Sequence, residues 1–161
     1  MAREGRTVNA ITTGWGFDVT QAPTVTNGAY SAGDIVGGLL TFGSVARYDG
    51  QPLVVTGVQI ISKAAVTPAW TLILFSADPS STTKTDNAAY SLNTADAFKV
   101  VATIPVTTIY DHGTPNSWRA EGLGIVVAPT ARALYGLLID GTGVTLTSTG
   151  DIQVRVRGLG A

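Results

Sequence analysis

Frequent turn-forming residues divide this chain into short runs of β-branched, aliphatic and aromatic residues, and this punctuation restricts the possible folds more than any other feature. The runs end at Gly, Pro, Asp or Asn, as at Asp49-Gly50 and Asp78-Pro79. Many short strands separated in this way are typical of β-sandwiches and barrels. We predict an all-β fold with two packed sheets, jelly-roll-like, of about eight strands and at most one short helix.

Two runs are apolar on both faces, residues 70–77 and 132–140. A strand with two apolar faces is expected to be covered on both sides, so both runs should lie in the interior. Their apolar side chains are Trp70, Leu72, Ile73, Leu74 and Phe75 in the first run, and Leu134, Leu137, Leu138 and Ile139 in the second.

The last run alternates cleanly between apolar and polar residues. Ile152, Val154 and Val156 should face the core, because side chains alternate between the two faces of a strand. The opposite face carries Asp151, Gln153, Arg155 and Arg157. We expect that face either to be solvated or to contact acidic groups of a partner.

Local signals predict several connections. Asp49-Gly50 suits a tight hairpin turn, which would make residues 34–45 and 53–63 antiparallel neighbours. Gly37-Gly38 predicts a bulge or a close backbone approach. Pro105 marks an edge strand or a bend, because proline cannot donate a hydrogen bond to a sheet. Residues 92–99 are the one helix candidate.

Residues 1–16 fit no strand pattern, so we predict an extended N-terminal arm followed by a single β-sandwich domain over residues 17–161. The arm is expected to lie either on a neighbouring subunit or along its own domain. Tryptophan and arginine are frequent anchors of interfaces. The candidate partner-binding residues are Arg3, Arg6, Trp15, Phe17, Arg155 and Arg157.

Composition narrows the classes of function. The 161 residues are 45% hydrophobic but only 13% charged, with a net charge of -1 and no run of basic residues. Nucleic-acid binding usually requires a basic patch, so we expect none. We also expect no membrane span and no signal peptide, because no apolar run is long enough. So little charge favours a surface that is partly covered by other protein.

We expect no catalytic residue, no cofactor and no metal, and therefore no enzyme. His112 is the single histidine, and cysteine is absent. Asp111 precedes His112 directly, and adjacent side chains usually point apart, so a solvated turn is favoured over a catalytic pair. Asp78, Asp86 and Asp96 are oxygen ligands of the kind calcium prefers, but their spacing matches no calcium loop, and turn-forming or capping roles are favoured.

The three tryptophans allow two interpretations. Trp15, Trp70 and Trp118 could line a sugar-binding face, as in lectin-like sandwiches. Tryptophans more often anchor cores or interfaces, and Trp70 belongs to the run predicted to be most buried.

Three stretches together resemble a group of small structural proteins of tailed-phage virions. They are residues 30–41 (YSAGDIVGGLLT), 72–88 (LILFSADPSSTTKTDNA) and 96–101 (DAFKVV). The resemblance covers the region from residue 30 to residue 101 and includes no catalytic motif.

The resemblance implies a capsid decoration, or cement, protein that binds the outside of an assembled head. Its partner would be the major capsid protein, and its location the capsid surface of the virion, after synthesis in the host cytoplasm. A repeated shell favours a homo-oligomer, a trimer or dimer at a local symmetry axis. The alternatives are a tail or baseplate component, or a carbohydrate-binding module on the virion surface.

Overall fold

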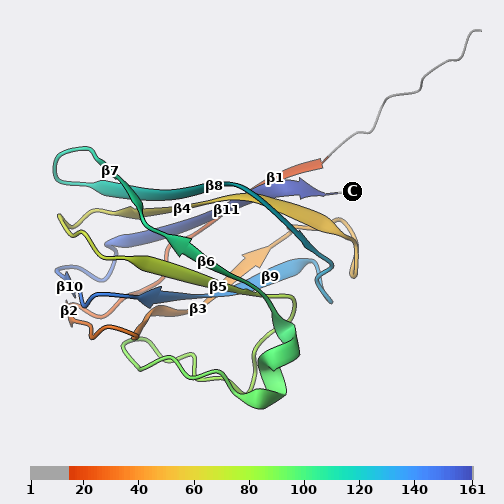
Figure 1. Cartoon of the computed structure of the whole chain (residues 1–161), viewed down its shortest axis with the longest axis horizontal. Coiled ribbons are helices and arrows are strands. Elements are labelled where there is room, and N and C mark those ends of the chain that lie inside the picture. The colour runs from red at the N-terminus through yellow and green to blue at the C-terminus, as the bar shows by residue number, and fades with distance from the viewer. Residues whose placement is uncertain (1–14, 161) are drawn as a thin grey trace, which may run out of the picture.

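The computed structural model describes residues 15–160 and forms two antiparallel β-sheets packed face to face (Figure 1). Its elements are β1 (Trp15–Gln21), β2 (Gly28–Ala29), β3 (Ile35–Gly43), β4 (Leu53–Ser62), β5 (Trp70–Phe75), the 3₁₀ helix η1 (Thr94–Lys99), β6 (Val100–Val106), β7 (Thr108–Asp111), β8 (Asn116–Val127), β9 (Ala133–Asp140), β10 (Thr145–Leu146) and β11 (Ile152–Gly160). The predicted all-β sandwich of two sheets is confirmed.

The strands pair in a nested order. The larger sheet has the order β1-β11-β4-β8-β7, the smaller sheet β3-β9-β5-β6, and β2 pairs with β10. Each strand of the first half therefore meets a strand of the second half: β1 with β11, β2 with β10, β3 with β9, β4 with β8, and β5 with β6. The described chain is therefore arranged as one long antiparallel hairpin that is folded around the core.

The main core fills the space between the two sheets, and a second apolar cluster lies on the other face of the smaller sheet. Trp70, Leu72 and Leu74 point into the main core, while Ile73 and Phe75 belong to the second cluster. Strand β9 divides in the same way, with Leu134 and Leu138 inside and Leu137 and Ile139 outside. The prediction that both runs are buried on two faces is confirmed.

The loop between β5 and η1 covers this second cluster. Tyr90 packs against it, and the backbone of the loop follows the edge of β3. The Ile35 N–H donates to the Ala88 carbonyl at 2.9 Å, and the Asn87 N–H donates to the Ile35 carbonyl at 2.8 Å. The loop therefore protects an edge strand that would otherwise offer unpaired backbone groups.

The predicted hairpin between β3 and β4 is wrong. Asp49-Gly50 does form a turn, with Gly50 at φ 72°, but the two strands lie in different sheets. The connecting segment crosses from one sheet to the other, and Val45 and Ala46 are buried in the main core on the way. Burial of these two side chains anchors the connection between β3 and β4 in the core, where it passes from one sheet to the other.

Three other local predictions are confirmed. The register of β3 against β9 shifts between Val36 and Leu39, where Gly37 and Gly38 adopt positive φ. Pro105 lies in β6, an edge strand of the smaller sheet. The helix candidate forms η1, capped by the Asn93 side chain.

Across residues 15–160 no helix is long and apolar enough to cross a membrane.

Strand β11 alternates as predicted, with one exception. Ile152 and Val154 are buried in the main core, whereas Gln153 is exposed and Arg155 half-buried on the other face. Asp151, expected on the outer face, is buried instead. It precedes the strand, and its carboxylate accepts backbone hydrogen bonds that close the turn after β10.

The sandwich begins earlier than predicted. Trp15 and Gly16, assigned to the arm, are the first residues of β1 and pair with Gly160 and Leu159 of β11. The rest of the predicted arm lies outside the described residues.

Candidate functional site

A row of apolar residues crosses the outward face of the larger sheet. Strand register places Leu159 beside Gly16 on one side and Val54 on the other, and Val54 beside Val126. Leu159 is 54% exposed and Val126 is 69% exposed. We call Gly16, Leu159, Val54 and Val126 the apolar row. Contiguous apolar side chains at outward positions mark a contact surface more often than isolated ones do.

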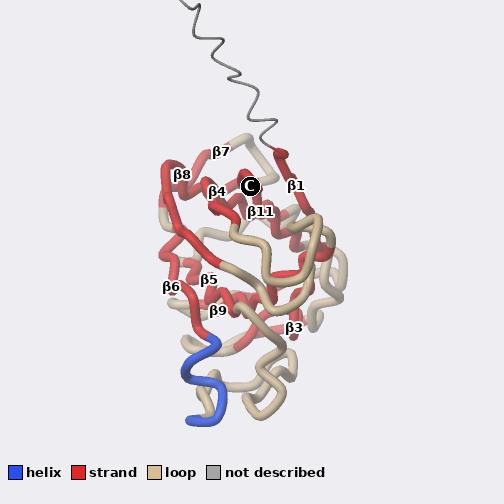
Figure 2. Tube along the Cα trace, turned by 90° about the vertical axis from the view of Figure 1, so that its right-hand side faces the viewer, coloured by secondary structure: helices blue, strands red, loops and turns tan. Residues whose placement is uncertain are grey.

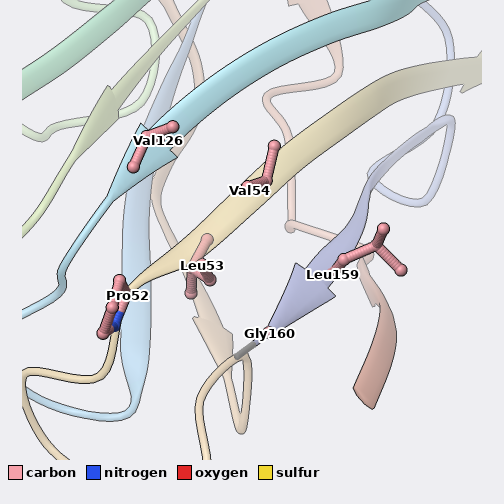
Figure 3. Close-up of a pocket in the computed structure, with 6 residues that line it drawn as sticks. All are labelled: Pro52, Leu53, Val54, Val126, Leu159 and Gly160. Carbon is pink, nitrogen blue, oxygen red and sulfur yellow. The ribbon is translucent and has the colours of Figure 1, made fainter. Parts of the chain in front are cut away.

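The apolar row borders a hollow that we call the apolar socket. Figure 3 shows its residues contributed by the adjacent strands β4, β8 and β11 and by the residue before β4. Its volume is about 190 Å³, and it is lined by Pro52, Leu53, Val54, Val126, Leu159 and Gly160. No lining residue carries a charge. The socket is therefore suited to an apolar side chain.

A band of charged residues lies beside the apolar row on the same face. Asp18 is opposite Arg157, and Arg157 is opposite Gly57, which is opposite Glu121. We call the four charged residues Asp18, Glu121, Arg155 and Arg157 the charged band. Arg157 Nη2 lies 3.8 Å from Glu121 Oε1. Gly57 provides the room, because a β-carbon there would lie 2.6 Å from Glu121 Oε2.

Arg155 forms a two-pronged ion pair with Asp18. This hydrogen bonding lowers the pKa of the Asp18 carboxyl and raises the pKa of the Arg155 guanidinium. Both side chains are nearly half exposed, so the pair adds only ~1 kcal/mol or less to stability. The Arg155 guanidinium remains partly exposed, so a partner could still contact it.

Five of the six predicted partner-binding residues separate into three groups. Arg155 and Arg157 lie on the outward face as expected, although both have ion-pair partners. Trp15 is half-buried, with the Arg47 guanidinium carbon 5.9 Å from its ring centroid. Arg3 and Arg6 lie outside the described residues.

The prediction for Phe17 as a contact residue is wrong. Phe17 is 6% exposed and belongs to the main core. It lies on the inward face of β1, whose outward positions are Gly16, Asp18 and Thr20. Trp15 lies 6.4 Å from Phe17 between ring centroids. Phe17 therefore anchors β1 to the sandwich and is not available to another protein.

Sequence reasoning missed a second exposed surface at η1. Phe98 is fully exposed, and Leu92 is 37% exposed. Figure 2 shows η1 at the end of the molecule away from β1, β4 and β8. We call Phe98 the aromatic knob. A phenylalanine left entirely in water forgoes about 1.5–3 kcal/mol of burial, which a partner would recover.

The segment that carries the aromatic knob is fixed by the buried side chain of Asp96. Its carboxylate accepts hydrogen bonds from Ser81 N at 2.9 Å, Thr82 Oγ1 at 2.8 Å and Lys99 Nζ at 2.7 Å. These interactions, the Lys99 ammonium first among them, lower the pKa of Asp96 to about 2. Lys99 Nζ also donates to the Asp78 carbonyl. The knob is therefore presented by a structured loop.

The three aspartates considered for calcium binding have separate structural roles. Asp78 pairs with Lys84 at 2.9 Å, and Asp96 holds η1 as described. Asp86 accepts hydrogen bonds from Thr26, Tyr30 and Gly37. Burial and this hydrogen bond raise the pKa of the Tyr30 hydroxyl. Within residues 15–160 no three His, Asp or Glu side chains group as metal ligands.

His112 lies in the hairpin between β7 and β8. Its Nε2 is 3.0 Å from Ser117 Oγ, and its backbone N–H donates to the Pro115 carbonyl. The neighbouring Asp111 carboxylate accepts from Gly113 N rather than from the imidazole. Ser117 is buried. These contacts close the turn.

Two of the three tryptophans cannot form an exposed sugar-binding face. Trp70 and Trp118 are fully buried and pack edge to face, with ring centroids 5.8 Å apart. They join the two sheets, since Trp70 lies on β5 and Trp118 on β8.

No protein-family model matches the chain, and no curated protein matches it.

Proposed function

We propose that the protein is a structural protein of a phage virion that decorates the capsid. In this role it binds the outside of the assembled shell of major capsid protein and stabilises it. The observation that carries the proposal is the outward face of the larger sheet, where the apolar row lies directly beside the charged band. An apolar centre with arginine at its margin is typical of protein–protein interfaces.

The fold supports this proposal. The nested strand pairing is the pattern that a jelly roll requires, and jelly rolls are frequent in viral capsid and lectin domains. A two-sheet sandwich with a continuous core is a stiff platform, so a flat contact surface loses little conformational freedom on binding. The small share of charged residues, 13%, agrees with a surface that is partly covered in its working state.

The resemblance to small virion proteins falls on continuous parts of this structure. Residues 30–41 run into β3, residues 72–88 form β5 and the start of the loop over the second cluster, and residues 96–101 join η1 to β6. The last two stretches include part of the loop after β5 and the aromatic knob itself. They support a shared architecture of the smaller sheet with its covering loop.

A decoration protein would act by mass action. A protein that binds the assembled shell and not its free subunits stabilises the shell by the free energy of binding at each site. Contacts to two adjacent capsid subunits would make the second attachment effectively intramolecular. Copies that also contact one another around a local symmetry axis would strengthen the lattice further.

The test compares heads that lack the protein with complete heads. Depleted heads should assemble with normal shape but open at a lower temperature, and purified protein should restore the resistance without metal or nucleotide. Heads that never assemble would identify a shell component instead. Heads of equal robustness that fail only in adsorption to cells would support the carbohydrate-binding alternative, and protein located on the tail would support the tail or baseplate alternative.

A further inference from the structure

We propose that the protein binds a calcium ion at one end of the sandwich, through the buried carboxylate of Asp140 and the buried side-chain carbonyl of Asn116. This end is the one where β2 and β10 lie (Figure 1). It is remote from the apolar row, because Asn116 and Val126 pair with opposite ends of β4. The inference therefore goes beyond the proposed capsid contact and uses none of its residues.

A cleft opens at this end between the loop after β4 and the loop after β9. Its volume is about 340 Å³, and it is lined by residues 65–68 and 142–145. The two loops are joined where the Gly141 N–H donates to the Ala69 carbonyl at 2.8 Å. None of the lining residues is charged, and three are threonines. The cleft therefore offers neutral oxygen atoms.

Strand register places the two proposed ligands on the inward faces of the two sheets at this end. Asp140 is the register partner of Trp70, which points into the main core, so both side chains share that face. Asn116 precedes the core residue Trp118 by two positions and shares its face. The Trp70 and Trp118 rings are in contact, with centroids 5.8 Å apart. The two strand ends therefore meet across the core.

Each ligand is bound to one wall of the cleft and keeps one oxygen free. Asn116 Nδ2 donates to the Val66 carbonyl at 2.9 Å, and the Thr142 N–H donates to Asp140 Oδ1 at 3.0 Å. Within residues 15–160, Asn116 Oδ1 and Asp140 Oδ2 have no hydrogen-bond partner, although the residues are only 5% and 0% exposed. Buried oxygen atoms normally have a partner, so both point to a bound group.

The charge at this end favours a cation over a neutral ligand. Within residues 15–160 Asp140 forms no ion pair. A second carboxylate residue without an ion pair, Asp34, lies beside it, since the Asp140 N–H donates to the Asp34 carbonyl at 3.0 Å. Asp34 is only 9% exposed. Buried charges in proteins are paired with an opposite charge or coordinate a metal.

The available ligands suit calcium. Calcium binds about 6–8 oxygen atoms from carboxylates, asparagine and backbone carbonyls and water, at about 2.3–2.6 Å. An ion between two such oxygens separates them by about 5 Å, which is half of the roughly 10 Å between packed sheets. The short side chains of Asp140 and Asn116 span the remaining distance.

Trp70 restricts where the ion can lie. Its indole N–H is a third buried polar group without a partner within residues 15–160. A cation is repelled by an N–H donor, so the ion should lie on the cleft side of the Asp140 carboxylate, toward Thr142. A water that accepts from the indole and donates to both oxygens is the alternative occupant, and it would give no response to calcium.

The affinity should be modest. Calcium affinity depends on the number of charged ligands, and here a single carboxylate oxygen is free, so we expect a dissociation constant of about 0.1–1 mM. Bound calcium would tie the loop after β4 to the loop after β9 and stabilise the folded chain. From the sequence we expected no metal. The proposed ligands come from β8 and the end of β9, which no spacing along the chain relates.

Thermal unfolding of the full-length chain, stripped with a chelator, tests the inference. Calcium at about 10 mM should raise the melting temperature by about 3–10 °C. Magnesium should raise it by less than half as much, because it requires a smaller, nearly octahedral site. Asp140→Asn should abolish the response to calcium. Asp151→Asn is the matched control, because its buried carboxylate accepts only from the far turn at Thr147 and Ser148, and it should keep the response.

Terbium binding by the unmodified chain keeps the test decisive if Asp140→Asn fails to fold. Terbium has the ligand preference of calcium and luminesces when a nearby tryptophan is excited, and Trp70 is the register partner of Asp140. The signal should saturate at one ion per chain and be displaced by calcium. The inference is overturned if terbium gives no saturable signal, if calcium and magnesium stabilise equally, or if Asp140→Asn keeps the response. Binding to heads is measured separately, so these results do not decide the proposed function.

Discussion

Gly158 lies so close to Phe17 that a β-carbon on Gly158 would be 2.5 Å from Cζ of the phenylalanine ring. The same β-carbon would lie 2.2 Å from the Val54 carbonyl oxygen. The pairing of β11 with β4 shifts register at this glycine, between Arg157 and Gly158. The absence of a side chain at Gly158 thus lets the Phe17 ring pack into the core beneath β11.

Gly158→Ala should therefore destabilise the protein by about 3 kcal/mol or more, since overpacking a core usually costs 1–3 kcal/mol and here a backbone carbonyl blocks relaxation. Gly57→Ala is the matched control, because its β-carbon would meet the movable end of Glu121. That variant should lose less than about 1 kcal/mol. Urea unfolding of both variants measures the difference, and equal losses would contradict the packing of Phe17 described above.

The buried edge-to-face pair of Trp70 and Trp118 should contribute strongly to stability. Truncation of either residue to alanine should cost about 3–5 kcal/mol. The double variant should lose about 0.5–1.5 kcal/mol less than the sum of the two, which is the coupling expected of an aromatic pair. Trp15→Ala, at a half-buried position, should cost less than either. A double-mutant cycle in urea tests this, and strict additivity would rule out a direct contact.

How much of this structure could be predicted from the sequence depends on whether the signal was local. The two-faced burial of β5 and β9 follows from apolar residues at consecutive positions, and the core face of β11 follows from its alternation. The partners of β3 and β4 do not, because nested pairing joins β3 to β9 and β4 to β8 across long stretches of chain. Asp49-Gly50 specifies a turn but not the sheet to which the chain returns.

The candidate surfaces were predictable to a similar extent. Arg155 and Arg157 were placed correctly because their parity in β11 fixes their face. Val126 could have been found in the same way, since its neighbour Val127 faces the core. Phe17 was misplaced because residues 1–16 were not recognised as containing the start of β1. The exposure of Phe98 depends on how the loop after β5 folds over the smaller sheet. The periodicity of apolar residues in the sequence does not indicate the path of a loop.

Removal of the Asp96 carboxylate should loosen the loop that presents the aromatic knob. Asp96→Ala leaves Ser81 N, Thr82 Oγ1 and Lys99 Nζ without their acceptor. We expect a melting temperature lower by about 5 °C, because buried donors without a partner are destabilising. Asp78→Ala is the control, since its carboxylate is exposed and bound to Lys84. Calorimetry that finds the same melting temperature for both variants would contradict the structural role of Asp96.

Asp96 should also make stability depend on pH in the acid range. Its pKa is lowered from the ordinary 3.8 of an aspartate to about 2 in the folded protein. A carboxyl group with a lowered folded pKa stabilises the protein above its unfolded pKa and loses that contribution as pH falls. The melting temperature should therefore decline between about pH 5 and pH 2. Asp96→Asn should show a shallower decline over the same interval, and an unchanged slope would contradict this assignment.

The apolar row provides the most direct test of the proposed decoration function. Val126→Asp places a charge at a position that is 69% exposed, so the folded chain should keep its melting temperature within about 2 °C. If the row contacts the capsid, the buried charge should weaken binding to heads by more than tenfold, which corresponds to about 1.4 kcal/mol. Gln153→Asp, at an exposed outward position of β11 outside the apolar row, is the matched control and should bind like the unmodified chain. Titration of depleted heads with each protein measures the affinities. Burial of an isolated carboxylate in an apolar interface is unfavourable. Undiminished binding by Val126→Asp would therefore mean that the capsid contact lies elsewhere.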